Sequence, residues 1–262
     1  MQGADALLRE LDRWVADGRT VAVWWRDDDA TQPTPALAQL VAAAQRCHAP
    51  LALAVIPALM SDALIPAVDD PLVSVLQHGF AHQNHAAAGE RAVECGGDRL
   101  ATAVLDELTA GRARLAAAFG SRFCPVMVPP WNRIEPAIAM ALPDHGFVGV
   151  SVFGPRSANP AGAGSFAINA HLDLLTWKGG VRFAGHDKLL RLCAERLADR
   201  RCGRIDPDEP FGLLTHHLDH DGETWAFLDD ILGLLAAHPA VRWAEAGALF
   251  DDAAPGVKAN QR

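Results

Sequence analysis

The 262-residue chain lacks the features that typify membrane-spanning and nucleic-acid-binding proteins. No apolar run approaches the ~20 residues that a membrane-spanning helix needs, and the first residues show no basic segment followed by an apolar one. No basic run exceeds Arg200-Arg201, and the formal net charge is −9. We therefore expect neither nucleic acid nor membrane insertion. A cytoplasmic protein is the default expectation, and the sequence does not indicate an oligomeric state.

Several common catalytic and binding motifs are also missing. The five cysteines are odd in number and include no Cys-x-x-Cys pair, which predicts reduced thiols and gives no support for a zinc ribbon. The chain has no Gly-x-Gly-x-x-Gly motif, phosphate-binding loop or Gly-x-Ser-x-Gly motif. Dinucleotide, nucleotide and serine-hydrolase functions are therefore not supported.

Apolar strand-like runs alternate with helical periodicity along the chain, and half of the residues are apolar. Repeated strand–helix units predict a mostly parallel sheet. We expect a single α/β domain over residues 1–262, a distorted (β/α) barrel of about seven parallel strands. The predicted helices are 4–17, 35–46, 99–119, 134–142, 187–200 and 223–237; the predicted strands are 20–25, 51–56, 73–76, 124–128, 147–152, 171–177, 211–216 and 240–243, with a loop at 154–166.

Three aspartates, Asp27-Asp28-Asp29, directly follow the apolar strand 20–25. Burying carboxylates there costs several kcal/mol each unless they are paired or bind a cation. In parallel α/β folds, active sites form at the carboxyl ends of the strands. Polar and ionisable residues follow other predicted strands as well, at 77–85, 129–133 and 216–221.

His78 and His82 lie four residues apart. On a helical turn this spacing would place both imidazoles on one face, close enough to bind one metal ion. One carboxylate of the aspartate triplet would complete a His-His-Asp set with open positions for water. Such a set suits zinc, which is our first candidate, as well as cobalt, nickel or ferrous iron.

These residues, in this order, resemble the five motifs of the polysaccharide deacetylase family, the NodB homology domain of carbohydrate esterase family 4. The motifs are Asp-Asp at a strand end, His-x-x-x-His, Pro-Pro-aromatic, Asp…Trp and Leu-x-His, and they span residues 20–217. The resemblance implies a NodB-like deacetylase fold and a divalent metal. It implies a hydrolase that removes an N-acetyl or other acyl group from a carbohydrate or related amide by attack of a metal-activated water.

The family's first motif reads Thr-Phe-Asp-Asp-Gly, followed after about four residues by Thr-Pro. Aligning that Thr-Pro with Thr34-Pro35 places the family's two aspartates on Asp27 and Asp28 and its glycine on Asp29. By this resemblance Asp27 is the general base and Asp28 is the metal ligand. The alternative register, which uses Asp28 and Asp29, also stays open.

The resemblance also carries roles onto the later motifs. His78 and His82 match the metal-binding histidines, and His216 matches the general acid, with His217 next to it as the competitor. The family's second acid in the fourth motif is Thr176 here, so Asp173 could support the catalytic histidine. The implied substrate-binding residues are Pro130, Trp131 and Trp177.

One departure concerns the arginine that pairs with the family's catalytic aspartate, because Val128 occupies its position. Arg26, Arg133 or Arg182 could take over this pairing, and Arg26, Asp29 and His217 are further supporting candidates. Two other functions stay open: hydrolysis of another non-peptide C–N bond, in a small or cyclic amide, and a carbohydrate-binding or partner module without catalysis.

Overall fold

The computed structural model describes residues 2–156 and 167–253. In this part of the chain, eight parallel strands form one curled sheet with the order β5-β4-β3-β2-β1-β9-β6, and β10 pairs with the start of β1. β7 and β8 form a separate antiparallel hairpin. The strands are β1 (Val21–Ala30), β2 (Leu51–Val55), β3 (Val73–His78), β4 (Phe123–Val128), β5 (Gly149–Val150), β6 (Leu172–Asp173), β7 (Leu175–Thr176), β8 (Arg182–Phe183), β9 (Phe211–Thr215) and β10 (Val241–Trp243).

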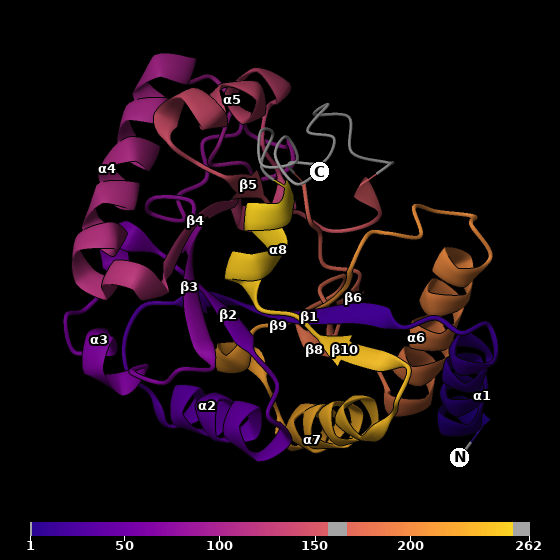
Figure 1. The fold of residues 1–262 in the computed structure, drawn as a ribbon. Helices are drawn as coiled ribbons and strands as arrows, with labels where there is room; N and C mark the ends of the chain where they lie inside the picture. Colours follow the sequence, from indigo (N-terminus) through magenta and orange to yellow (C-terminus); the bar gives the residue numbers. More distant parts are fainter. Residues whose placement is uncertain (1, 157–166, 254–262) are drawn as a thin grey trace, which may run out of the picture.

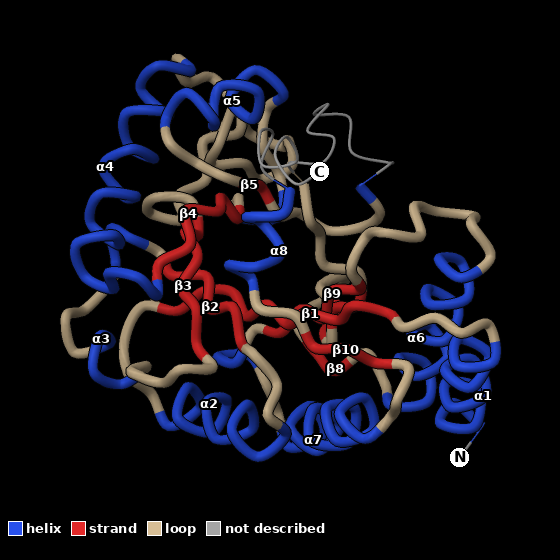
Figure 2. Tube along the Cα trace, in the orientation of Figure 1, coloured by secondary structure: helices blue, strands red, loops and turns tan. Residues whose placement is uncertain are grey.

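Helices surround the curled sheet, and α8 lies across the middle of the ring of strands in the view of Figure 1. Figure 2 shows the same arrangement by secondary structure, with α8 in the middle and the other helices around the strands. The order of strands and helices confirms the predicted α/β barrel-like fold. The helices are α1 (Gln2–Ala16), α2 (Pro35–Cys47), α3 (Leu64–Ala67), α4 (Ala101–Phe119), α5 (Pro136–Ala141), α6 (His186–Arg201), α7 (Gly222–Ala237) and α8 (Ala246–Ala253).

The barrel is distorted because its last gap is closed only by isolated bridges. Val150 and Phe153 form parallel bridges with Ala167 and Ala170, whereas the residues that follow pair with β9. The predicted strand 171–177 is wrong in its length. It is split, because the Asp173 carboxylate accepts a hydrogen bond from the Leu175 backbone N–H at 2.9 Å, and the chain then turns to pair with β8.

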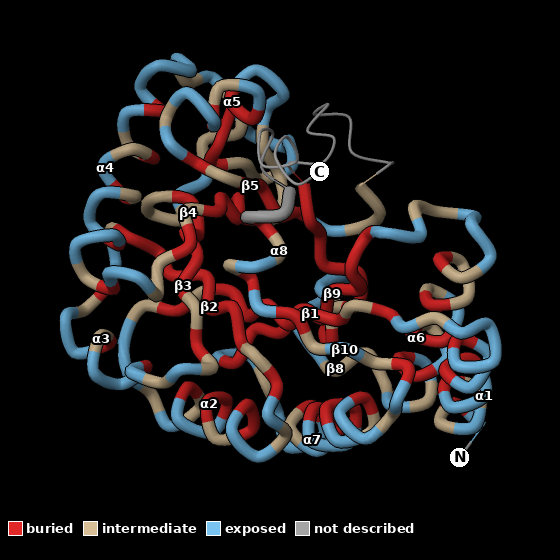
Figure 3. The backbone as a smooth tube through the Cα atoms, viewed as in Figure 1, coloured by how far each residue is buried: buried red, intermediate tan, exposed pale blue. Residues whose placement is uncertain are grey.

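The two faces of the sheet carry different cores, because side chains alternate along a strand. On the outer face, Val21, Val23 and Trp25 of β1 pack in the large core against the helices. On the inner face, Trp24 packs in a smaller core whose small residues, including Ala52, leave room for it. Most strands of the ring are buried, with β10 the more exposed exception, whereas the helices bury one side and expose the other (Figure 3). This alternation decides where the polar side chains at the strand ends lie.

Local sequence signals set the ends of the flanking helices. The Thr34 side chain accepts a hydrogen bond from the Leu37 backbone N–H at 3.0 Å, and Pro35 starts α2. Asp221 accepts from the Thr224 N–H at 2.8 Å at the start of α7. None of the described helices is long and apolar enough to cross a membrane. The described residues include all five cysteines and contain no disulfide.

Candidate metal centre and active-site pocket

β1 ends in three consecutive aspartates whose side chains lie in three different environments. The Asp27 side chain lies on the outer face of β1 and is fully buried. The Asp28 side chain lies on the inner face, as that of Arg26 does, and lines a pocket. Asp29 adopts φ 72°, a left-handed conformation that aspartate tolerates better than most residues. It also lines the pocket. The pleat of β1 and this one turn therefore separate the three carboxylates.

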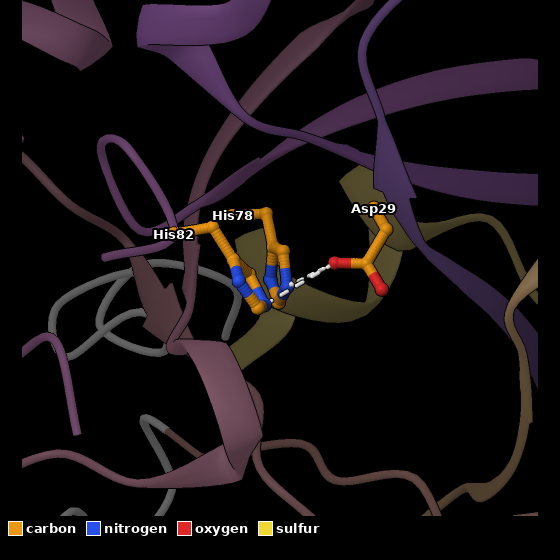
Figure 4. Close-up of side chains that lie close together, drawn as sticks. All are labelled: Asp29, His78 and His82. Atoms are coloured by element: carbon orange, nitrogen blue, oxygen red, sulfur yellow. Dashed lines mark ion pairs between the residues drawn. The ribbon is translucent and has the colours of Figure 1, made fainter. Parts of the chain in front are cut away.

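Asp29, His78 and His82 form a cluster that could hold a metal ion. The Asp29 Oδ1 atom lies 3.1 Å from His78 Nε2 and 3.4 Å from His82 Nε2. One ligand atom from each residue lies within 4.8 Å of the other two. Figure 4 shows both imidazole rings facing the Asp29 carboxylate from the same side. Two nitrogens and one oxygen that converge in this way leave coordination positions open on the pocket side.

Hydrogen bonding at the cluster fits a bound cation. His78 Nδ1 lies 3.0 Å from the Val128 carbonyl oxygen, which can only accept, so Nδ1 carries the hydrogen and Nε2 faces Asp29. The buried Asp29 Oδ1 atom has no other hydrogen-bond donor among the described residues. A lone pair on Nε2 would face a carboxylate lone pair, and a metal ion between them would satisfy both. The residues present therefore fit a divalent metal.

Charge at the cluster leads to the same conclusion. Burial opposes ionisation of Asp29, but when His78 carries a proton on Nε2 as well, its hydrogen bond and charge hold the pKa of the Asp29 carboxyl far below the ordinary value. Burial likewise opposes protonation of His78, yet the nearby charges of Asp28 and Asp29 raise the pKa of its imidazole. The site attracts positive charge.

The loop after β3 brings His82 back to His78, and it is not the helical turn that the spacing suggested. His78 is the last residue of β3, and His82 adopts φ 55°. The buried Glu94 carboxylate holds this loop by accepting backbone hydrogen bonds, including one from Ala81 at 2.7 Å. Gly79 is required beside it, because an added Cβ would lie 1.9 Å from Glu94 Oε2.

Arg26 holds Asp28 on the inner face. Arg26 Nη2 donates to Asp28 Oδ2 at 3.0 Å, and its Nε forms an ion pair with Oδ1 at 2.9 Å, so the two side chains are in close contact and almost fully buried. The guanidinium also donates to Asn132 Oδ1 at 2.7 Å and to Ser151 Oγ at 2.7 Å. Among the three arginines considered as replacements for the one missing at Val128, Arg26 is the one that pairs with an aspartate of the triplet.

The other two arginine candidates lie elsewhere. Arg133 donates to the Ala92 carbonyl oxygen, and Arg182 donates to the carbonyl oxygen of Lys178. Within the described part of the chain, neither forms a hydrogen bond or ion pair with the triplet, so Arg26 is the candidate that is placed for the pairing.

His216 lies between two carboxylates at the pocket. Its Nε2 atom is 4.0 Å from Asp28 Oδ2, and its Nδ1 atom is 3.9 Å from Asp173 Oδ1. Trp177 Nε1 donates to Asp173 Oδ2 at 2.8 Å, and its ring lies edge-on to the His216 ring with centroids 4.7 Å apart. Burial raises the pKa of Asp173, and the His216 charge opposes this. Asp173 is therefore placed beside His216, where it could orient the imidazole.

His217 faces the opposite side of the sheet. Its Nδ1 atom lies 2.5 Å from Asp27 Oδ1, and its backbone N–H donates to Asp27 Oδ2 at 3.0 Å. Thr215 Oγ1 donates to the same carboxylate oxygen at 2.6 Å and accepts from Trp25 Nε1. This network is sealed from solvent, with His217 1% exposed and Asp27 0% exposed.

The pocket joins the metal cluster to His216. It has a volume of about 850 Å³ and is lined by Asp28, Asp29, both cluster histidines, Trp131, Asp173, Trp177 and His216, among others. The Trp131 ring lies against His82, with centroids 4.5 Å apart. Pro130, by contrast, is buried next to Gly79 and does not line the pocket.

The structure therefore brings the predicted site residues together, but the aspartates at the pocket lie one position later along β1 than the preferred register placed them. The sequence register preferred Asp28 as the metal ligand and Asp27 as the base, but Asp29 faces the histidines and Asp28 faces His216 across the pocket. Asp27 cannot reach the pocket because it is fully buried on the outer face of β1. The structure favours the alternative register, Asp28 and Asp29.

Sequence reasoning did not identify three residues that shape the site: Glu94, Asn132 and Ser151. Each comes from a segment outside the motif it supports, and no local spacing links it to its partner. Only for Asn132 does the sequence give a signal, because it directly follows the Pro-Pro-Trp motif among the polar residues after a predicted strand.

Comparison with known proteins supports the fold. No protein-family model matches the chain, and no curated protein sequence matches it. Among solved structures, a family 4 acetyl xylan esterase from Clostridium thermocellum in complex with a cobalt ion is 13% identical, with 88% of this chain and 90% of that chain covered and a TM-score of 0.51.

Two further structures match over most of this chain. A peptidoglycan N-acetylglucosamine deacetylase is 11% identical, with 91% and 95% coverage and a TM-score of 0.55. A mutant of a family 4 pseudoenzyme is 13% identical, with 89% and 68% coverage and a TM-score of 0.56. These likenesses confirm the fold that the sequence resemblance implied. Because one of them is a pseudoenzyme, the function has to be argued from the site.

Proposed function

We propose that the protein is a metal-dependent hydrolase that removes an N-acetyl or other acyl group from a carbohydrate or a related amide. One observation carries the proposal: a buried carboxylate oxygen that lacks a donor lies within 3.4 Å of two histidine nitrogens at a pocket. An acid and a histidine of suitable type, Asp28 and His216, line the same pocket. A binding module would not need this second pair.

The ligands in this proposal are Asp29, His78 and His82. A divalent metal, with zinc as the first candidate, would polarise the acyl carbonyl and lower the pKa of a bound water. The hydrogen bond and ion pair with Arg26 fix the orientation of the Asp28 carboxylate. Asp28 then acts as the general base and takes the proton of the attacking water.

His216 is the general acid in this proposal. Its Nε2 faces the Asp28 side of the pocket, and its Nδ1 faces Asp173, which orients the ring. His216 therefore gives its proton to the departing amine. Trp131 and Trp177 line the pocket on either side and could stack on a sugar ring.

The test is release of acetate from N-acetylglucosamine oligomers by the purified protein, with the divalent metal content measured in parallel. We expect turnover that is lost with a chelator and restored by zinc or cobalt. A variant His216→Gln should bind metal and lose turnover. Binding of no divalent metal, together with no acetate release, would contradict the proposal. Turnover of a small or cyclic amide in place of the sugars would keep the mechanism and change the substrate.

A further inference from the structure

The pocket of this acidic protein is flanked by four basic side chains. Arg91 and Arg133, which lie near each other, line it together with Lys178 and Lys188, and Lys178 directly follows Trp177 in the chain. Lys178 follows β7, and Lys188 lies in the first turn of α6. Positive charge in a protein of net charge −9 is therefore gathered around the pocket of the candidate catalytic centre.

The two lysines stand out because lysine is rare in this chain. The 262 residues include only three lysines, against 20 arginines. Two of the three, Lys178 and Lys188, line the pocket. The third, Lys258, lies outside the described residues. Lysine presents a compact ammonium with three donors on a flexible stem, which suits an anion whose position varies.

None of the four basic side chains has a carboxylate partner among the described residues. The contrast on α6 is direct, because Asp187 pairs with Arg191 and not with its neighbour Lys188. Burial and the nearby Arg91 guanidinium lower the pKa of Arg133, so the two arginines repel each other. An anion between the basic groups would relieve this repulsion.

The acids of the pocket do not supply that anion. Asp28 is held by Arg26, Asp29 faces the two histidines, and Asp173 accepts from Trp177. All three lie at the catalytic centre, where they have partners of their own. The basic side chains thus lack a counter-ion that a bound ligand could provide.

We propose that the pocket selects a substrate that carries a negatively charged group, a carboxylate or a phosphate, on the sugar or amide that bears the acyl group. This inference rests on the proposed function and names its substrate class. The two lysines and the two arginines of the pocket bind the anion. The field of these groups also raises the concentration of anionic substrate at the pocket.

The test compares three substrates with the same N-acetyl group: an N-acetylglucosamine disaccharide, the same disaccharide with a 6-phosphate, and one with a uronate carboxylate. The wild-type protein should show a higher kcat/KM for at least one anionic substrate, and the advantage should fall as salt is raised. The two anionic arms decide between phosphate and carboxylate.

The double variant Lys178→Gln, Lys188→Gln should lower the ratio of anionic to neutral kcat/KM by about 10–100-fold, the effect of losing charge-assisted hydrogen bonds. Arg191→Gln is the matched control, because it removes a charge from α6 that is paired with Asp187. The control should keep the wild-type ratio.

An equal kcat/KM for neutral and anionic substrates, or an unchanged ratio in the double variant, would overturn the inference. Failure of the proposed function has a different signature, namely no acetate from any substrate. In that case, calorimetric binding of the 6-phosphate and uronate disaccharides to the wild type and to the double variant decides the inference: weaker binding by the variant supports it, and equal or absent binding overturns it.

Discussion

Two aspartate–histidine pairs lie back to back where β1 ends and directly after β9, one on each face of the sheet. On the inner face, Asp28 and His216 are 4.0 Å apart and line an open pocket. On the outer face, Asp27 and His217 are in direct contact at 2.5 Å and are sealed among buried side chains. The same residue types therefore occur one position apart in two opposite environments.

The comparison shows that burial and unused hydrogen-bond acceptors distinguish a structural aspartate–histidine pair from one that can act on a substrate. The Asp27 carboxylate accepts from Thr215, from the His217 backbone and from the His217 ring, so its acceptor positions are occupied. Asp28 is held by one partner, Arg26, and still faces the pocket. We expect the inner pair to act on substrate and the outer pair to hold the strand ends in register.

Loss of the metal ligand should have the largest effect. Asp29→Ala removes the only oxygen of the three-residue cluster, so metal content and turnover should both fall to the level of the chelator-treated protein. Metal analysis and acetate release on the same sample test this. A variant that keeps a full equivalent of metal would rule out Asp29 as a ligand.

Removal of the proposed base comes next. Asp28→Asn keeps the size of the side chain but cannot accept the water proton, so kcat should fall by about 10²–10⁴-fold while metal stays bound. The measurement is kcat together with metal content. The neighbouring substitution Asp27→Asn is its matched control, because it makes the same chemical change one residue away on the other face.

Asp27→Asn should act on stability. Breaking a buried ion pair from one side costs about 3–5 kcal/mol in the free energy of unfolding, and we expect the lower end because asparagine keeps part of the hydrogen bonding. Urea unfolding measures this loss, and kcat of the folded variant should change by less than about tenfold, since acid–base catalysis is retained. If a folded Asp27→Asn protein lost as much turnover as Asp28→Asn, the assignment of a structural role to Asp27 would be wrong.

The smallest expected effect is the pH dependence of the stability that the Asp27–His217 pair contributes. Burial opposes protonation of His217, but Asp27 raises its pKa above the ordinary 6.5. A raised histidine pKa stabilises the fold fully below pH 6.5, and this contribution is lost as pH rises through the raised value. The stability gap between wild type and Asp27→Asn should therefore narrow from pH 6 to higher pH. A gap that is constant or widens would contradict an ionic pair.

Much of the fold follows from sequence patterns, because strand-like runs and helical periodicity alternate with clear breaks. The split of the predicted strand 171–177 could not be seen, since it depends on the Asp173 side chain and on pairing with β8. His78 and His82 were correctly grouped, but their approach depends on a loop held by Glu94, which lies 12 residues beyond His82.

The alternation of side chains along β1 also bears on which aspartates reach the pocket. Val21, Val23 and Trp25 form the apolar outer face of β1, and alternation carries Asp27 onto that same face. Spacing to Thr34-Pro35 indicated the other register. In the structure, β1 runs on to Ala30 with a shift in its pairing to β2 after Asp27, and Asp29 is the aspartate that lies beside the two histidines.

The most direct test of this account is a crystal structure of the zinc- or cobalt-loaded protein with diffraction recorded at the metal absorption edge. We predict one anomalous peak about 2.0–2.2 Å from an Asp29 carboxylate oxygen and from Nε2 of His78 and His82, with Asp28 still paired to Arg26. A metal bound by Asp28, or no metal at the cluster, would contradict the separation of roles along β1.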